Sequence, residues 1–225
     1  MKNKIIFTLF TLVVFLGVGF YISSKVFSLF PKDRPLGKSE ENIGNVTSAK
    51  TKELSLDTAG VEQNAKPNIP PPNLNRPVNI TGDLSDAAKK MATEKIVEMS
   101  SALKKDPSLF DTWLILGIHR KTIGDYEGAR EIWEYAAALR PGNYIPFNNL
   151  GDLYAFFLKD NKKAEENFNK AIELSPNRIH VYYSFYEFYR YVMKDDAKTK
   201  ALLKKGIAAN PGAASQGLQE LLQNY

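Results

Sequence analysis

Two histidines and adjacent carboxylate pairs such as Glu165-Glu166 and Asp195-Asp196 are the residues of this 225-residue chain whose types could support acid–base or metal chemistry. His119 and His180 lie 61 residues apart (180−119), and neither a His-x3-His pair nor a cysteine accompanies them. A structural or catalytic zinc site needs three or four nitrogen or sulfur ligands. Glu165-Glu166 and Asp195-Asp196 are adjacent in sequence, so the two members of a pair do not face each other across a cleft. We therefore expect no catalytic residue, metal site or cofactor, and we interpret both histidines as helix-surface residues.

Phosphate and nucleic-acid recognition also lack their usual patterns. Gly-Asp-Tyr-Glu-Gly (124–128) is predicted to be a hairpin turn rather than a phosphate-binding loop. Lys198, Lys200, Lys204 and Lys205 cluster on one expected helix, but residues 84–225 carry 20 Lys and Arg against 18 Asp and Glu. A nucleic-acid footprint requires a denser basic face. We interpret the lysines as a solvated helix surface and expect no nucleic-acid partner.

The chain has a repeat marked by prolines. Pro107, Pro141, Pro176 and Pro211 are separated by 34, 35 and 35 residues (141−107, 176−141, 211−176). The large and small residues between them recur in one order. In the first interval they are Trp113, Leu116, Gly117, Tyr126, Ala129, Trp133 and Ala136, and in the second Phe147, Leu150, Gly151, Tyr154, Ala164, Phe168 and Ala171. A period near 34 predicts a solenoid of helical hairpins.

The small residues of this pattern have a packing role. Gly117 and Gly151 would let the two helices of a hairpin approach closely, and Ala129 and Ala164 would do so from the second helix. A longer side chain there would overpack the contact at a cost of ~1–3 kcal/mol. Each proline would end a second helix, and each second helix has an aspartate as its predicted N-cap. These N-cap residues are Asp125, Asp160 and Asp195.

The order of residues resembles the tetratricopeptide repeat family, with its Trp-x2-Leu-Gly, Ala-x3-Phe and closing Pro pattern. Repeats are expected at 110–143, 144–178 and 179–212, with the extra residue of the second placed in the turn at 158–161. In the third, Tyr186 replaces the close-approach glycine, so its helix spacing is left open. The resemblance implies an all-α, right-handed superhelical solenoid of about three hairpins.

Flanking helices would complete a TPR-like domain at 84–225. Residues 84–104 form a predicted leading helix with Met91, Ile96, Met99 and Leu103 at near-helical spacing. Residues 213–224 form a predicted C-terminal cap helix, of the kind that keeps an open-ended array soluble.

The first 83 residues have a different character. Ile5 to Ile22 is an uncharged run of 18 residues, about 27 Å long as a helix, which favours a membrane anchor at 1–30 with a transmembrane helix at about 5–24. A cleaved signal peptide is the alternative. Lys and Arg counting favours a cytoplasmic C-terminus, whereas the short basic N-terminus favours a signal-anchor with the domain outside, and we adopt the latter. Residues 31–83 are predicted to be a disordered linker rich in Pro, Asn, Ser and Lys.

Helical spacing separates a core face from a second face on the first helix of each hairpin. In the resembling family this second face is the inner wall of the superhelix, where peptides or partner helices bind. The candidate residues are Leu114, Ile118, Asn148, Asp152, Phe156, Tyr183, Glu187 and Tyr191. Some of them would alternatively pack against the next helix or the C-terminal cap.

The chain is thus predicted to be a non-catalytic scaffold that binds another protein in a concave groove. A self-associating structural or assembly protein, and hence a homo-oligomer, is the alternative. No small-molecule substrate is indicated.

Overall fold

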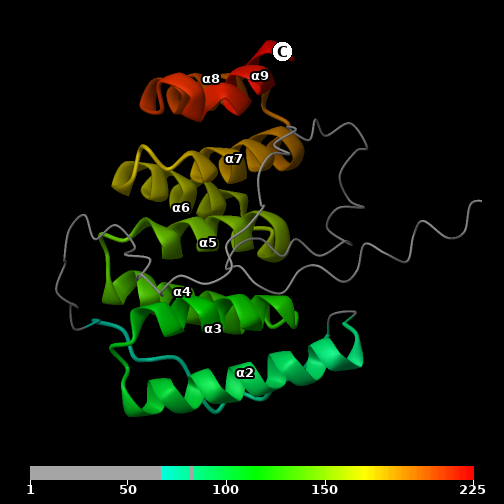
Figure 1. Cartoon of the computed structure of the whole chain (residues 1–225), viewed down its shortest axis with the longest axis vertical. Helices are drawn as coiled ribbons and strands as arrows, with labels where there is room; N and C mark the ends of the chain where they lie inside the picture. Colours follow the sequence, from blue (N-terminus) through cyan, green and yellow to red (C-terminus); the bar gives the residue numbers. More distant parts are fainter. Residues whose placement is uncertain (1–66, 82–83) are drawn as a thin grey trace, which may run out of the picture. The chain divides into compact units, whose positions relative to one another are not determined.

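The computed structural model describes residues 67–81 and 84–225, and within them it contains helices and no strand. The helices are α2 (Asp86–Lys105), α3 (Phe110–Thr122), α4 (Tyr126–Leu139), α5 (Tyr144–Leu153), η1 (Tyr154–Leu158), α6 (Asn161–Leu174), α7 (Ile179–Glu187), η2 (Phe188–Met193), α8 (Asp196–Ala209), η3 (Gly212–Ser215) and α9 (Gln216–Gln223). They succeed one another along the long axis from α2 to α9 (Figure 1). The expected all-α array of hairpins is confirmed.

The close approach within the first two hairpins is the one predicted from the glycines. A Cβ built on Gly151 of α5 would lie 2.7 Å from the ring of Phe168 in α6, and one on Gly117 of α3 would collide with the ring of Trp133 in α4. The indole Nε1 of Trp133 donates a hydrogen bond to the Leu114 carbonyl at 3.1 Å. Aromatic rings therefore fill the space that the missing side chains leave.

The third hairpin packs differently. Tyr186 replaces the glycine on α7, and the backbones of α7 and α8 are in much less extensive contact than those of the other pairs. The close approach is transferred to the second helix, where a Cβ on Gly206 would lie 2.8 Å from the Tyr182 ring and 2.7 Å from Leu218. The repeat exists, and Leu218 of the terminal helix completes its core.

In repeats two and three, the segment from the repeat start to the N-cap of the second helix is one residue longer than in repeat one (160−144 and 195−179 against 125−110), and a π-helical turn accommodates this residue. The first helix of these repeats ends in η1 and η2, where Asp160 and Asp195 donate their N–H groups to the carbonyls of Tyr154 and Tyr189, six residues earlier (160−154, 195−189). The residues before them, Lys159 and Lys194, adopt left-handed φ values of 60° and 52°. A single inserted residue can widen the last helical turn in this way without breaking the helix.

The three aspartate N-caps are confirmed. The side chains of Asp125, Asp160 and Asp195 accept hydrogen bonds from the backbone N–H three residues later, at 3.0, 3.0 and 2.9 Å. Each satisfies a donor that an uncapped helix would leave without a partner.

One equivalence inferred from the repeat pattern is wrong. Tyr126 begins α4, whereas Tyr154 lies at the end of the first helix of its repeat. The residue that stands in the first repeat where Tyr154 stands in the second is Arg120, 34 residues earlier (154−120). Arg120 is only 2 % exposed.

Helices flank the three hairpins on both sides. The leading helix α2 buries Ala92, Ile96, Ser100 and Leu103, while Met91, predicted on the apolar face, is exposed. At the other end, a short 3-10 turn precedes α9, and Leu218 is fully buried.

Residues 67–81, here called the strap, pack against the first hairpin although they belong to the predicted linker. Leu74, Val78 and Ile80 are partly buried against the core, and Thr81 donates its N–H to the Ile123 carbonyl at 2.9 Å. The strap supplies acceptors to buried Arg120, which is why it is ordered despite its linker-like composition.

The predicted anchor at 5–24 and the rest of the linker lie outside the described residues. In the two ranges that the structure does describe, no helix has the length and apolar character needed to cross a membrane.

Candidate protein-binding groove

The candidate residues lie on the first helices of the three hairpins. On α3, Leu114 is only 7 % exposed and belongs to the hydrophobic core, while Ile118 is 45 % exposed and accessible to a partner. The apolar floor expected in the first repeat is therefore reduced to Ile118.

An ion pair joins the same faces of α3 and α5. The ammonium of Lys121 lies 2.7 Å from a carboxylate oxygen of Asp152. The same ammonium stands 5.3 Å above the ring centre of Phe157 in η1. Asp152 is thus already paired, and a binding partner would contact a salt bridge beside aromatic rings rather than a free carboxylate.

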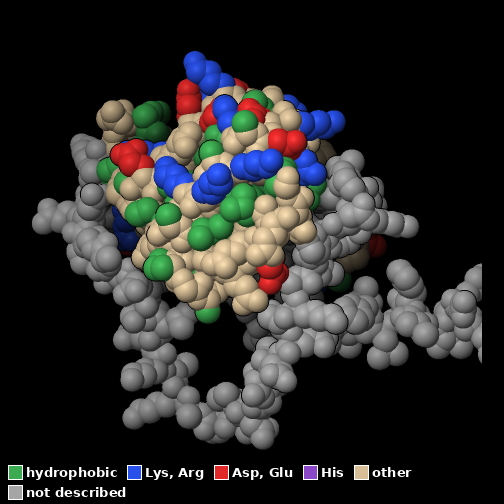
Figure 2. Space-filling model, turned by 90° about the horizontal axis from the view of Figure 1, so that it is seen from above, with side chains coloured by type: hydrophobic (Ala, Val, Ile, Leu, Met, Phe, Trp, Pro, Cys, Tyr) green, Lys and Arg blue, Asp and Glu red, His purple; other side chains and the backbone are tan. Residues whose placement is uncertain are grey.

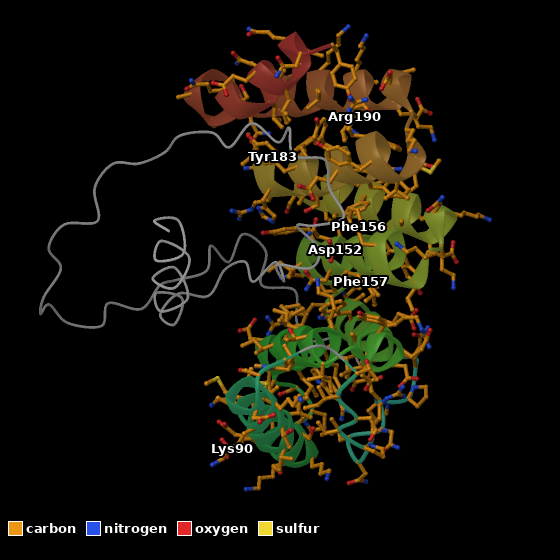
Figure 3. The ribbon with its side chains drawn as sticks, turned by 90° about the vertical axis from the view of Figure 1, so that its right-hand side faces the viewer. Lys90, Asp152, Phe156, Phe157, Tyr183 and Arg190 are labelled. Atoms are coloured by element: carbon orange, nitrogen blue, oxygen red, sulfur yellow. The ribbon has the colours of Figure 1, made fainter. Side chains whose placement is uncertain are left out.

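Phe156 and Phe157 stand side by side in the π turn η1, and both are partly buried against the core. Figure 3 labels them with Asp152 at the level of α5, with Tyr183 and Arg190 further along the stack. Because the π turn widens the helix end, it changes the direction in which these two rings project relative to a regular helix.

Asn148, one turn before Asp152, carries a side-chain oxygen that is buried without a hydrogen-bond partner. Leaving such an oxygen unpaired costs ~1–3 kcal/mol. A donor group on a ligand would relieve this cost if the surrounding side chains opened to admit it.

In the third repeat, Tyr183 packs against the C-terminal helix α9 and Tyr191 packs against Tyr186. Tyr183 is 36 % exposed, and its hydroxyl abuts Gly217 of α9. Partial burial, with the nearby charge of Glu220, raises the pKa of Tyr183. The ring of Tyr191 lies edge-on to that of Tyr186 at 6.2 Å, and Glu187 is partly buried. The alternative that a candidate residue packs against the C-terminal cap is thus realised for the Tyr183 hydroxyl.

The histidines are half-buried rather than fully on the surface. Burial lowers the pKa of both, helped by the positive charges of Lys95 for His119 and Arg178 for His180. The His180 ring also lies 5.5 Å from that of Tyr144. Across residues 67–81 and 84–225, no three or more metal-binding side chains gather in one place.

The basic cluster on α8 belongs to a mixed surface. Lys and Arg side chains gather at the end of the stack formed by α8 and α9, with Asp and Glu among them (Figure 2). Lys198 pairs with Glu165 at 2.6 Å, and Arg190 pairs with Asp196 at 3.1 Å.

Two features outside the eight candidate residues were not found from the sequence. One is the strap with its partners on α3 and α4, and the other is a groove of about 290 Å³ lined by residues of α4, α5, η1 and α6. The sequence signal for the strap is the presence of Arg120 at the repeat position that Tyr154 fills in the next hairpin.

Comparison with protein-family models agrees with a hairpin repeat in this chain. The tetratricopeptide repeat family model matches residues 146–178. A comparison with solved structures finds the crystal structure of MamA, with 24 % sequence identity and a TM-score of 0.46 over 63 % of this chain and 88 % of that one. No curated protein matches the chain in sequence. The chain thus contains a tetratricopeptide repeat within an array of helical hairpins.

Proposed function

We propose that the chain is a non-catalytic scaffold, tethered to a membrane by residues 5–24, that binds a peptide or helix of a partner protein on the inner face. The inner face is defined by the eight candidate residues on α3, α5, η1, α7 and η2. The repeat architecture supports the proposal, since arrays of this kind present extended surfaces to other proteins.

The observation that carries the proposal is the exposure of two of the candidate side chains on the first helices. Ile118 and Tyr183 are both more than a third exposed although neighbouring residues of the same helices are buried. Between them lie the partly buried ring of Phe156 and the unpaired oxygen of Asn148. An apolar residue of a ligand would find contact area here, and its backbone N–H would find an acceptor in Asn148 once the surrounding side chains opened.

The binding test is site-specific photo-crosslinking on the full chain. A benzophenone side chain at position 118 or 183 should capture the same partner, whereas one at exposed Val97 on α2 should not. Capture should fall strongly in a Phe156→Ala variant that keeps its helical circular dichroism. Equal capture from all three positions would refute inner-face binding, and capture of a second copy would favour the self-associating alternative.

We also propose that the hairpin array lies on the extracytoplasmic side of the membrane. The basic residues Lys2 and Lys4 before the apolar run support this orientation. Protease added outside intact cells should digest the array while leaving a short anchor-bearing fragment. Protection of the array would place it in the cytoplasm, and recovery of the array without the anchor would indicate a cleaved signal peptide.

A further inference from the structure

The strap fills a groove on the first hairpin, here called groove 1, and one arginine fixes it there. The guanidinium of Arg76 contacts both carboxylate oxygens of Asp125 at 2.9 and 3.0 Å and lies 3.5 Å from Glu131. Arg120, on the floor, donates to the backbone carbonyls of Arg76 and Pro77, both at 2.8 Å. With the strap in place, groove 1 retains a cavity of only about 10 Å³.

A second groove repeats the first at the next hairpin. Groove 2 is the 290 Å³ groove lined by residues of α4, α5, η1 and α6. Four of its lining residues correspond to lining residues of groove 1. Before the inserted residue the offset is 34 positions (150−116, 154−120), and after it the offset is 35 (166−131, 167−132). The pairs are Leu116 and Leu150, Arg120 and Tyr154, Glu131 and Glu166, and Ile132 and Asn167.

The acidic clamp that holds Arg76 is also repeated. Asp160 occupies the position of Asp125 (160−125 is 35), and Glu166 occupies that of Glu131. Both acids have only distant lysine partners, Lys163 and Lys162, at 4.0 Å. The third hairpin lacks the clamp, because Ala201 stands where Glu166 would recur (201−166 is 35).

We propose that groove 2 binds an extended segment of a partner protein that presents an arginine beside apolar residues, as the strap does with Leu74, Arg76 and Pro77. The partner's guanidinium would lie between Asp160 and Glu166, and its apolar side chain would contact Leu150 and Tyr154. A planar guanidinium suits two carboxylates better than an ammonium does, because its five N–H donors lie in a rigid fork that pairs bidentately with a carboxylate and leaves donors for the second one. The chain's own strap is excluded as the occupant, since its Arg76 and Thr81 are bonded to the first hairpin.

Groove 2 differs from groove 1 in one respect that the proposal must satisfy. Lys163 stands where groove 1 has Gly128, and its ammonium lies 5.1 Å above the ring centre of Tyr154. An incoming arginine must displace this half-exposed ammonium. Removing the lysine should therefore improve binding, an effect that no purely structural role of Lys163 would produce.

The test uses a fluorescent synthetic peptide with the strap's own sequence, residues 70–81, titrated into the full chain and followed by anisotropy. We expect saturable binding that Glu166→Lys weakens at least tenfold and Lys163→Ala tightens about threefold. The peptide with alanine in place of its arginine should lose at least tenfold. Glu173→Lys on the same helix changes the net charge equally at an exposed position and should leave the affinity within twofold.

Several results would overturn the proposal. Equal weakening by Glu166→Lys and Glu173→Lys would mean non-specific attraction, and sensitivity to Glu131→Lys alone would mean that the peptide displaces the strap from groove 1. Absence of binding to the Lys163→Ala variant would exclude a strap-like ligand. If light scattering showed dimers that Glu166→Lys dissociates, the occupant would be a second copy rather than another protein. None of these outcomes depends on the inner face, so the two proposals fail separately.

Discussion

Replacing Asp125 by asparagine should destabilise the protein far more than the same change at Asp160. Both aspartates are N-caps at equivalent positions, with cap hydrogen bonds of 3.0 Å. Asparagine is as good an N-cap as aspartate, so the change preserves the cap and removes only the charge. At Asp125 that charge is the counter-ion of two arginines, Arg76 at 2.9 Å and the buried Arg120 at 3.1 Å.

The magnitude follows from the burial of the pair. Breaking a buried ion pair costs about 3–5 kcal/mol when one charge is left behind. The figure is reduced here because Arg120 keeps two carbonyl acceptors and Arg76 is partly exposed to water. We expect Asp125→Asn to lower the free energy of unfolding by about 2–3 kcal/mol, at roughly 2–4 °C of melting midpoint per kcal/mol for a chain of this size. Among the described residues, Asp160 pairs with Lys163 at a distance of 4.0 Å on the surface, so Asp160→Asn should cost less than ~0.5 kcal/mol.

Urea unfolding of the purified full chain, followed by circular dichroism, measures both variants. The reasoning would be refuted if the two substitutions had equal effects, because the difference between them rests entirely on the strap and Arg120. Limited proteolysis gives an independent measurement. Cleavage between residues 67 and 81 should become faster in Asp125→Asn while remaining unchanged in Asp160→Asn.

Three further predictions concern packing, backbone strain and pH. Gly151→Leu should lower the free energy of unfolding by at least ~1–3 kcal/mol because the new side chain collides with the ring of Phe168. Lys162→Ala changes a side chain that is 85 % exposed and should change the free energy of unfolding little. Equal small effects of the two variants in thermal melts would contradict the packing of the second hairpin. Lys159→Gly should stabilise by about 0.5–1 kcal/mol in urea, since glycine adopts the left-handed φ of 60° without strain, and a loss of stability would show that the lysine is not strained there. Burial would raise the pKa of Glu165, but hydrogen bonds, of which that from Lys198 is the larger, lower the pKa overall. The resulting stabilisation is present above the unfolded pKa near 4.5 and is lost as the pH falls through the folded pKa. The free energy of unfolding of Glu165→Gln should therefore decline less than that of the parent over this acid range, and an equal decline would contradict the assignment.

The repeat pattern predicted most of the fold because its signals are local and redundant. The glycine, alanine and proline positions each reflect a contact within one hairpin, and Gly151 against Phe168 is such a contact. The aspartate N-caps are local as well, because the side chain of Asp160 bonds to a residue three positions away. Signals of this kind can be recognised in a single sequence because the two residues of each contact belong to the same hairpin.

The candidate inner face was less predictable because exposure depends on the neighbouring repeat. Spacing alone assigned Leu114 and Ile118 to one face, but α3 buries the first and exposes the second. Asp152 was expected to offer a hydrogen bond, yet it pairs with Lys121, 31 residues earlier in the chain (152−121). A helical wheel shows which residues share a face of one helix. It does not predict which of them the neighbouring hairpin covers, because that depends on how successive hairpins pack.

The strap escaped prediction for a different reason. Its composition resembles that of a disordered chain, and a segment with few apolar residues does not order itself. The missing information lay in the folded array, where the position filled by Tyr154 and Tyr189 in two repeats is filled by Arg120 in the other. The hydroxyls of the two tyrosines bond to glutamates of the array, at 2.8 and 2.7 Å. A buried guanidinium needs more acceptors than one glutamate provides, and the array supplies Arg120 with Asp125 alone. Such a mismatch implies acceptors from outside the repeats, and the strap provides them, so a buried arginine among repeated tyrosines is a sequence signal for a segment bound to the array.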